Sequence, residues 1–250
     1  MKYLSIVVIV AVSCFMSVNA ASVIPPWLTP CKGTDPKLSE CAEKEANKVI
    51  PIIVKGYPKL NLPVLEPLNI PEIKVEANGQ LNIILRDGLV NGLSQAKASD
   101  FKLDFKNQKI GFKLFIPNLN ILSQYEVDGR ILVLPIQGKG PGNITAVDGL
   151  YDISFSFELY DKKGVQYAKM KDVDVSFDLK RLYIRFDNLF NGNKELGDAA
   201  NNAVNAEWRV VLKELEPVIK GAIGEVVLLV ANGVADKVPY AEIFGGEIPA

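Results

Sequence analysis

Apolar and polar residues alternate along the middle of the chain, from about residue 73 to residue 190. Within this region the runs 101–105 and 110–116 alternate strictly and are separated by a short polar break at 107–108. A period of two predicts β-strands, and two alternating runs joined by a short break are typical of an antiparallel hairpin.

Two later runs repeat the pattern. Residues 153–159 and 173–179 place Ile, Val, Phe and Leu on one side and Asp, Ser and Glu on the other. The phase shifts at Lys180-Arg181 and the alternation then continues to residue 186. The acidic residues of "DVDVSFD" (172–178) therefore indicate the solvated side of a strand, since a calcium loop would also need a glycine at its turn. The whole region predicts a long antiparallel sheet with one apolar face.

After Asn191-Gly192 the apolar period becomes helical. The apolar stripe of this region consists of Val204, Trp208, Val211, Leu215, Ile219, Ala222, Val226 and Leu229. We predict one helix over 196–235, about 40 residues and about 60 Å long. Charged residues between 214 and 225 interrupt any apolar run of membrane-spanning length. The all-apolar run 226–231 predicts burial on most sides of the helix by the sheet.

The N-terminal part predicts a shorter helix. Asp35 has the character of an N-cap, Pro36 suits the first helical position, and Pro51 is expected to kink the helix. The segment 62–71 has a proline every fourth residue and is expected to be extended without forming a central strand. The predicted fold class is α+β, with the long helix packed on the apolar face of the sheet.

The first residues have the layout of a secretory signal, with Lys2, an apolar core and small residues before a cleavage site after Ala20. We predict a signal peptide over 1–20. Cys14 would leave with it, and Cys31 and Cys41 would pair as a disulfide in an oxidising compartment. Asn143 begins an N-x-Thr glycosylation sequon beside "GKGPG" (138–142), which we interpret as a loop. Sequons often stay unmodified, so both states of Asn143 remain open.

Composition narrows the function classes. The chain has 250 residues, a formal net charge of −1 and no histidine. Without histidine, Ser-His-Asp and Cys-His catalysis and the commonest zinc ligand are excluded. We predict no catalytic residues, no metal site and no cofactor, and the near-neutral charge speaks against nucleic acid as a partner. An enzyme is disfavoured.

Several ordered segments resemble the insect takeout and juvenile hormone binding protein family. They are "IPPWLTPCKGTDPKLSEC", "GYPKLNLPVLEPLNIPEI", "GKGPGNITAVDGLYDI", "WRVVLKELEPVI" and "VPYAEIF". The resemblance covers essentially the whole of 21–250, which we interpret as a single lipid-binding domain. No cysteine follows Cys41, so the second disulfide of the haemolymph hormone carriers is missing and the chain is more similar to the takeout proteins.

The resemblance implies a long helix wrapped by a highly curved antiparallel sheet around a hydrophobic tunnel, in a binding protein rather than an enzyme. The predicted tunnel lining is Ile83, Leu85, Phe105, Phe112, Leu114, Phe155, Phe157, Phe177, Ile184, Trp208, Val211, Leu215, Ile219, Ala222 and Val226. Any of these could equally be plain core. Gly221, Ala222 and Gly224 either widen the tunnel or allow close packing of helix on sheet, and the sequence leaves both open.

The predicted function is a secreted, extracellular, monomeric carrier of a small or elongated hydrophobic ligand. A juvenile-hormone-like terpenoid, a fatty acid or a semiochemical fits this class, and delivery to an unidentified receptor is compatible with it. The alternative is an innate-immune protein that engages membrane lipids, a role that usually uses a basic surface. Stable membrane insertion is not expected.

Overall fold

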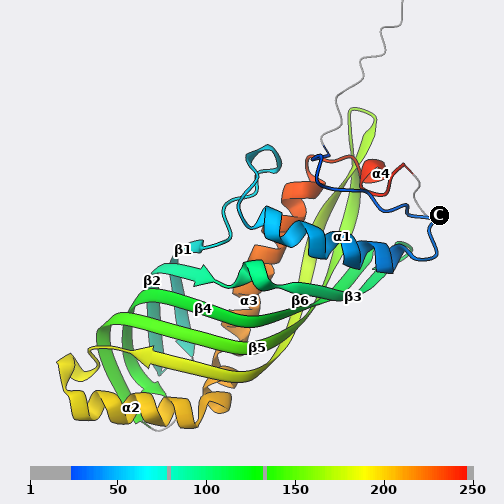
Figure 1. Ribbon diagram of the computed structural model, residues 1–250. Coiled ribbons are helices and arrows are strands. Elements are labelled where there is room, and N and C mark those ends of the chain that lie inside the picture. Colours follow the sequence, from blue (N-terminus) through cyan, green and yellow to red (C-terminus); the bar gives the residue numbers. More distant parts are fainter. Residues whose placement is uncertain (1–23, 78–79, 132–133, 247–250) are drawn as a thin grey trace, which may run out of the picture.

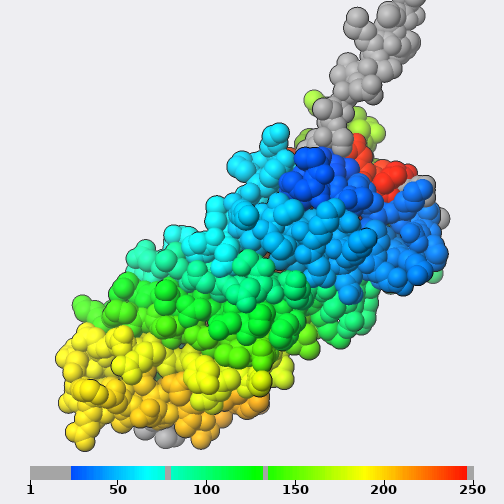
Figure 2. Space-filling view, viewed as in Figure 1, coloured from blue at the N-terminus to red at the C-terminus, as the bar shows by residue number. Residues whose placement is uncertain are grey.

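The structure is a computed structural model that describes residues 24–77, 80–131 and 134–246, and the predicted signal peptide lies outside these residues. Its helices and strands follow one another in the order α1 (Leu38–Ile53), β1 (Leu68–Ala77), β2 (Leu81–Asn91), β3 (Lys97–Asp104), β4 (Lys109–Ile131), β5 (Leu134–Lys162), β6 (Val165–Phe186), α2 (Lys194–Ala206), α3 (Trp208–Ala235) and α4 (Tyr240–Ile243). The sheet curls around α3 as a half-barrel (Figure 1). In the space-filling view, α1 covers one end of the molecule and α2 covers the other (Figure 2).

The sheet is antiparallel throughout, in the order β1-β2-β4-β5-β6, and β3 pairs with the first part of β4. The hairpin predicted around residues 107–108 is confirmed, since Leu103 pairs with Ile110 and Asp104 with Lys109. The phase shift predicted at Lys180-Arg181 is also confirmed, because burial passes from Leu179 to Leu182 instead of keeping its period of two.

The prediction of a loop at "GKGPG" was wrong. Residues 138–142 belong to β5 and pair with β4. Gly138 and Gly140 form no turn there, but they allow the backbone of residues 187–189 to approach β5 closely. An added Cβ would lie 2.9 Å from Cα of Leu189 at Gly138, and 2.7 Å from the carbonyl oxygen of Asp187 at Gly140. The segment after β6 therefore crosses directly over this strand, which larger residues would prevent.

Near the N-terminus, Cys31 and Cys41 form the predicted disulfide, with Cα atoms 5.9 Å apart. The predicted helix start at Pro36 was two residues early. Asp35 instead closes a turn ahead of α1, and its side chain accepts a hydrogen bond from the backbone N–H of Lys37 (2.8 Å). The Pro-rich segment 62–71 ends inside β1, which is an edge strand, as its prolines predicted.

The single helix predicted over 196–235 was wrong. Glu207 leaves the helical conformation (φ −101°, ψ 28°) and separates α2, of 13 residues, from α3, of 28. A straight helix of about 60 Å would run past the end of the sheet. With the break, α2 lies across the end of the sheet while α3 runs along its concave side (Figure 1).

Burial of α3 on most sides, expected from the run 226–231, was also wrong. Leu229 is 44% exposed. Since the sheet is only a half-barrel, α3 forms the remaining part of the wall and keeps one face in water. It has the length and apolar content of a membrane span. Its predicted stripe faces the sheet from Trp208 to Val226 but not at Leu229. Trp208 and Val211 are buried, and Leu215 borders a cavity.

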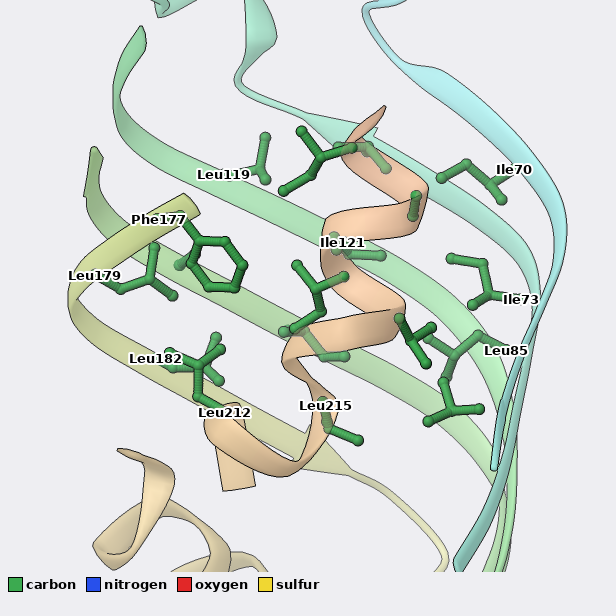
Figure 3. Close-up of a pocket in the computed structure, with 18 of the residues that line it drawn as sticks. Ile70, Ile73, Leu85, Leu119, Ile121, Phe177, Leu179, Leu182, Leu212 and Leu215 are labelled. Atoms are coloured by element: carbon green, nitrogen blue, oxygen red, sulfur yellow. The ribbon is translucent and has the colours of Figure 1, made fainter. Parts of the chain in front are cut away.

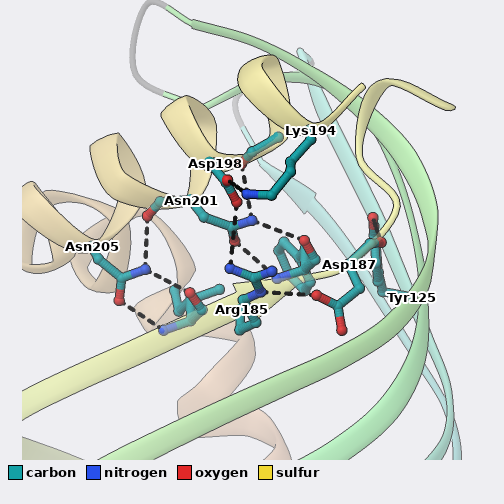
Figure 4. Close-up of polar contacts among 10 residues, drawn as sticks. Tyr125, Arg185, Asp187, Lys194, Asp198, Asn201 and Asn205 are labelled. Carbon is teal, nitrogen blue, oxygen red and sulfur yellow. Dashed lines mark hydrogen bonds and ion pairs between the residues drawn. The ribbon is translucent and has the colours of Figure 1, made fainter. Parts of the chain in front are cut away.

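Asparagines on three helices hold the edge strands. In the described part of the chain, each of four asparagine amides bonds both the N–H and the C=O of one strand residue. These edge clamps are Asn47 on Ala98 of β3, and Asn201 on Phe186, Asn205 on Ile184 and Asn232 on Met170 of β6. All eight donor–acceptor distances lie between 2.6 and 3.1 Å. The amide repeats the pairing of a neighbouring strand, so the helices complete the edges of β3 and β6 at these four residues. Figure 4 shows Asn201 and Asn205 of α2.

We expect Asn201→Ala to lower the free energy of unfolding by about 2–4 kcal/mol, because it leaves the backbone N–H and C=O of Phe186 without partners in a buried site. Urea denaturation measures this. The neighbouring Asn202 is exposed, and Asn202→Ala should change stability by less than about 0.5 kcal/mol. Equal effects of the two substitutions would contradict the role of the clamp.

Candidate ligand-binding cavity

A cavity of about 290 Å³ lies between α3 and the concave face of the sheet (Figure 3). Its wall is built from the inward-facing positions of β1, β2, β4, β5 and β6, from one side of α3, and from Val204 of α2 and Leu93. Every lining side chain is aliphatic except Tyr151, Phe177 and Phe186. Because the apolar positions of the strands and of the α3 stripe face the cavity, its wall is almost purely hydrocarbon.

Most of the predicted lining residues border this cavity. They are Ile83, Leu85, Leu114, Phe177, Ile184, Val211, Leu215, Ile219, Ala222 and Val226. Sequence reasoning missed the contribution of β1, which includes Ile70 and Ile73, because the prolines up to Pro71 predicted an extended segment that forms no central strand. It also missed Leu212, Val218 and Ile223, since a single stripe names about one residue per turn while α3 presents a broader face.

The other predicted lining residues lie elsewhere in the described structure. They are Phe105, Phe112, Phe155, Phe157 and Trp208. Phe105 packs edge-on against Phe244 at 5.0 Å between ring centroids, and Phe157 packs on Tyr240 at 5.7 Å. Large rings fill the space between sheet and helix, so these positions belong to solid core.

Trp208 is buried at the start of α3 and lies under the guanidinium groups of Arg181 and Arg209, whose Cζ atoms are 5.7 and 4.4 Å from its ring. These contacts hold the indole outside the cavity wall. The break at Glu207 immediately precedes this anchor.

Gly221 and Gly224 of α3 take different roles from Ala222. Gly221 faces open space, with nothing within 4 Å of an added Cβ. At Gly224 an added Cβ would lie 2.7 Å from Cγ1 of Val173, so this glycine allows close packing of α3 on β6. Of the three small residues, Ala222 alone borders the cavity. Close packing therefore accounts for Gly224, and added cavity width can come only from Ala222.

Tyr151 carries the one polar side-chain group of the wall. It lies between Leu114 of β4 and Phe177 of β6 in the sheet. Its hydroxyl makes no hydrogen bond within the described residues, and burial raises the pKa of this phenol to about 12. The ring lies over Gly149, where an added Cβ would be 2.7 Å from the hydroxyl oxygen. The cavity thus offers one neutral hydroxyl in a hydrocarbon surrounding.

No metal-binding group of His, Cys, Asp and Glu occurs among the residues that the structure describes. The ion pairs lie on the outer surface, for example Lys113 with Asp100 (2.6 Å) and Lys171 with Glu158 (2.8 Å). In each pair the partner lowers the pKa of the carboxyl, through a hydrogen bond first and charge attraction second. The acidic residues of "DVDVSFD" lie on the solvated side as predicted, and Asp172 accepts a hydrogen bond from Ser156 there (2.6 Å).

A family model described as haemolymph juvenile hormone binding protein matches residues 6–245. The chain belongs to this family. Among solved structures similar to this family member, Takeout 1 of Epiphyas postvittana has 28% sequence identity and a TM-score of 0.78, over 85% of this chain and 97% of that one. The family and the fold class predicted from the sequence are confirmed.

Two curated proteins match this family member over nearly their full length. The circadian clock-controlled protein daywake of Drosophila melanogaster is 26% identical over 247 residues, which cover 94% of this chain and 93% of that protein. The protein of the same name from Drosophila yakuba is 24% identical over 241 residues, 92% of each.

The raised pKa of Tyr151 predicts a pH dependence. A tyrosine ionises near pH 10 when unfolded and near pH 12 here, so its contribution to stability is complete below pH 10 and is lost between pH 10 and 12. Between pH 9 and 12, the free energy of unfolding of the wild type should therefore fall by about 2 kcal/mol more than that of Tyr151→Phe. Urea denaturation across this range measures the difference, and identical pH profiles would contradict the assignment.

Proposed function

We propose that this protein is a secreted carrier that holds a small or elongated hydrophobic ligand, such as a terpenoid, a fatty acid or a semiochemical, in the cavity beside α3. The observation that carries the proposal is a continuous aliphatic wall around about 290 Å³ with a single hydroxyl in it. A family of binding proteins is consistent with this role, and no catalytic role is proposed.

Hydrocarbon burial supplies the affinity. Each buried methylene contributes about 0.8 kcal/mol, so a sixteen-carbon chain gains roughly 12 kcal/mol before the cost of ordering it reduces that figure. Such a ligand needs little directed chemistry. This explains why the sequence has no polar motif pointing to the site, and why the candidate ligand-binding residues are the lining positions themselves, from Leu68 to Val227.

Tyr151 defines the polar part of the ligand. With a pKa of about 12 its hydroxyl is protonated at physiological pH and can donate one hydrogen bond. An oxygen that accepts, such as that of an ester, a carbonyl or a hydroxyl, fits this partner. A charged group would find no counter-charge among the lining side chains. We therefore favour a neutral ligand with one oxygen function over a fully ionised one.

Secretion is part of the proposal. It rests on the signal peptide predicted over 1–20 and on the Cys31–Cys41 disulfide, which suits an oxidising compartment. Asn143 is exposed on β5, so a glycan there would extend from the outer face of the sheet. We propose that the carrier acts extracellularly as a monomer and is free to meet a receptor.

Ala222→Trp tests the site. The indole would occupy the cavity, so binding of a fluorescent fatty-acid methyl ester should fall by roughly tenfold or more while the thermal unfolding transition remains cooperative. The matched control is Gly221→Trp, one residue away, where the added side chain meets open space. The control should bind as the wild type does. Unchanged probe binding in Ala222→Trp, or equal loss in both variants, would contradict the proposal.

Tyr151→Phe tests the polar contact. Affinity for methyl palmitate should fall about fivefold, which corresponds to one hydrogen bond of about 1 kcal/mol. Affinity for a hydrocarbon of the same length, which offers no acceptor, should stay the same. Competition with the fluorescent probe measures both. A parallel loss for the two ligands would point to a packing defect instead of a lost hydrogen bond.

A further inference from the structure

The inward-facing side chains of β4, β5 and β6 form rows across the sheet. One row contains Leu114, Tyr151 and Phe177, which are paired through the register of the strands. All three border the cavity. Successive rows on one face are two residues apart along each strand, about 6.8 Å. The lining can therefore be followed row by row toward the end of the molecule that carries α4.

The next row contains Phe112, Ile153 and Val175. Of these, Ile153 alone still borders the cavity. One row further, Phe155 pairs with Ile110 and neither borders it. The cavity thus ends within two rows.

Two phenyl rings stand at this end. Phe112 and Phe155 meet edge to face with ring centroids 6.3 Å apart, and Phe101 stacks on the other side of Phe112 at 5.3 Å. We name Phe112 and Phe155 the end wall. Phe155 is buried and Phe112 is half-buried, so both rings are fixed by packing.

The space behind the end wall is filled. Phe157, Ala168, Ala235, Tyr240 and Phe244 form a separate cluster there, each at most 8% exposed. The C-terminal segment supplies two of these residues and seals this end of the half-barrel. A ligand chain that reaches the end wall therefore cannot advance unless the rings move.

We propose that the end wall, Phe112 and Phe155, sets the maximum length of hydrocarbon chain that the cavity buries. This inference rests on the proposed function as a hydrophobic carrier. Each methylene that enters the cavity raises affinity about fourfold. Once the chain fills the last lining row in front of the rings, further methylenes find no room beyond it and the gain stops. The length at which the gain stops is the break in the affinity series.

The test uses a series of fatty acid methyl esters with chains of increasing length, measured by competition with a fluorescent probe. For the wild type, affinity should rise about fourfold per methylene up to a break. Phe155→Leu and Phe112→Leu each remove three side-chain carbons from the end wall and should move the break to chains about two to three carbons longer. Leu114→Phe, in the row before the wall, adds a ring and should move the break to shorter chains.

The matched control is Phe157→Leu, the same substitution two residues along β5 in the cluster behind the wall. It should lower thermal stability without moving the break. If the wild type binds no ester of any length, the proposed function fails. If the wild type shows a break but every cooperatively unfolding variant at Phe112, Phe155 and Leu114 keeps it, the carrier stands and the end wall is overturned. A shift in Phe157→Leu equal to that in Phe155→Leu would also overturn it.

Discussion

Closure of the sheet edges is the constraint on which this structure depends. A half-barrel leaves unpaired backbone groups along its edge strands, and such groups cost free energy wherever water is excluded. On β3 and β6 the edge clamps meet that need at four residues with asparagine amides from the helices. Asn201, Asn205 and Asn232 attach α2 and α3 to the same strand, β6. The position of α3, and with it the cavity, follows from this attachment.

The cavity exists because α3 is attached to the sheet only on either side of it. Gly224 brings α3 close to β6 at Val173, and Asn232 fixes the helix to Met170 further along. Between these contacts and Trp208, the middle of α3 faces the sheet across open volume. Aliphatic side chains line this volume and aromatic clusters fill the end beyond it. The shape of the site is therefore a consequence of where rings and small residues fall along regular elements.

The sequence predicted which face of each strand is apolar, but not how deep each position lies. Phe155 and Ile153 share one face of β5 and the same pattern, yet one belongs to the end wall and the other borders the cavity. Depth depends on strand register and on the C-terminal segment, which contacts Phe105 through Phe244 across a long separation in sequence. Such contacts leave no local pattern.

The break at Glu207 was hidden for a related reason, because the apolar stripe continues from Val204 to Trp208 and Val211 without a change of period. The clamps were similarly invisible. An asparagine on a helix is ordinarily read as solvent-exposed, and only the spacing of Asn201 and Asn205, four residues apart beside the apolar stripe, marks them in the sequence. The disulfide and the hairpin, in contrast, depend on residues near one another in the chain and were predicted correctly.

The clamps have a consequence for how such a protein can change. On β6, Asn201 and Asn205 bind the backbone of Phe186 and Ile184 and not their side chains, which border the cavity. Phe186 and Ile184 therefore each bind an edge clamp through the main chain and border the cavity with the side chain. Substitutions of these side chains change the shape of the cavity but leave the hydrogen bonds of the edge clamps in place. The same fold can therefore bind hydrophobic ligands of different shape.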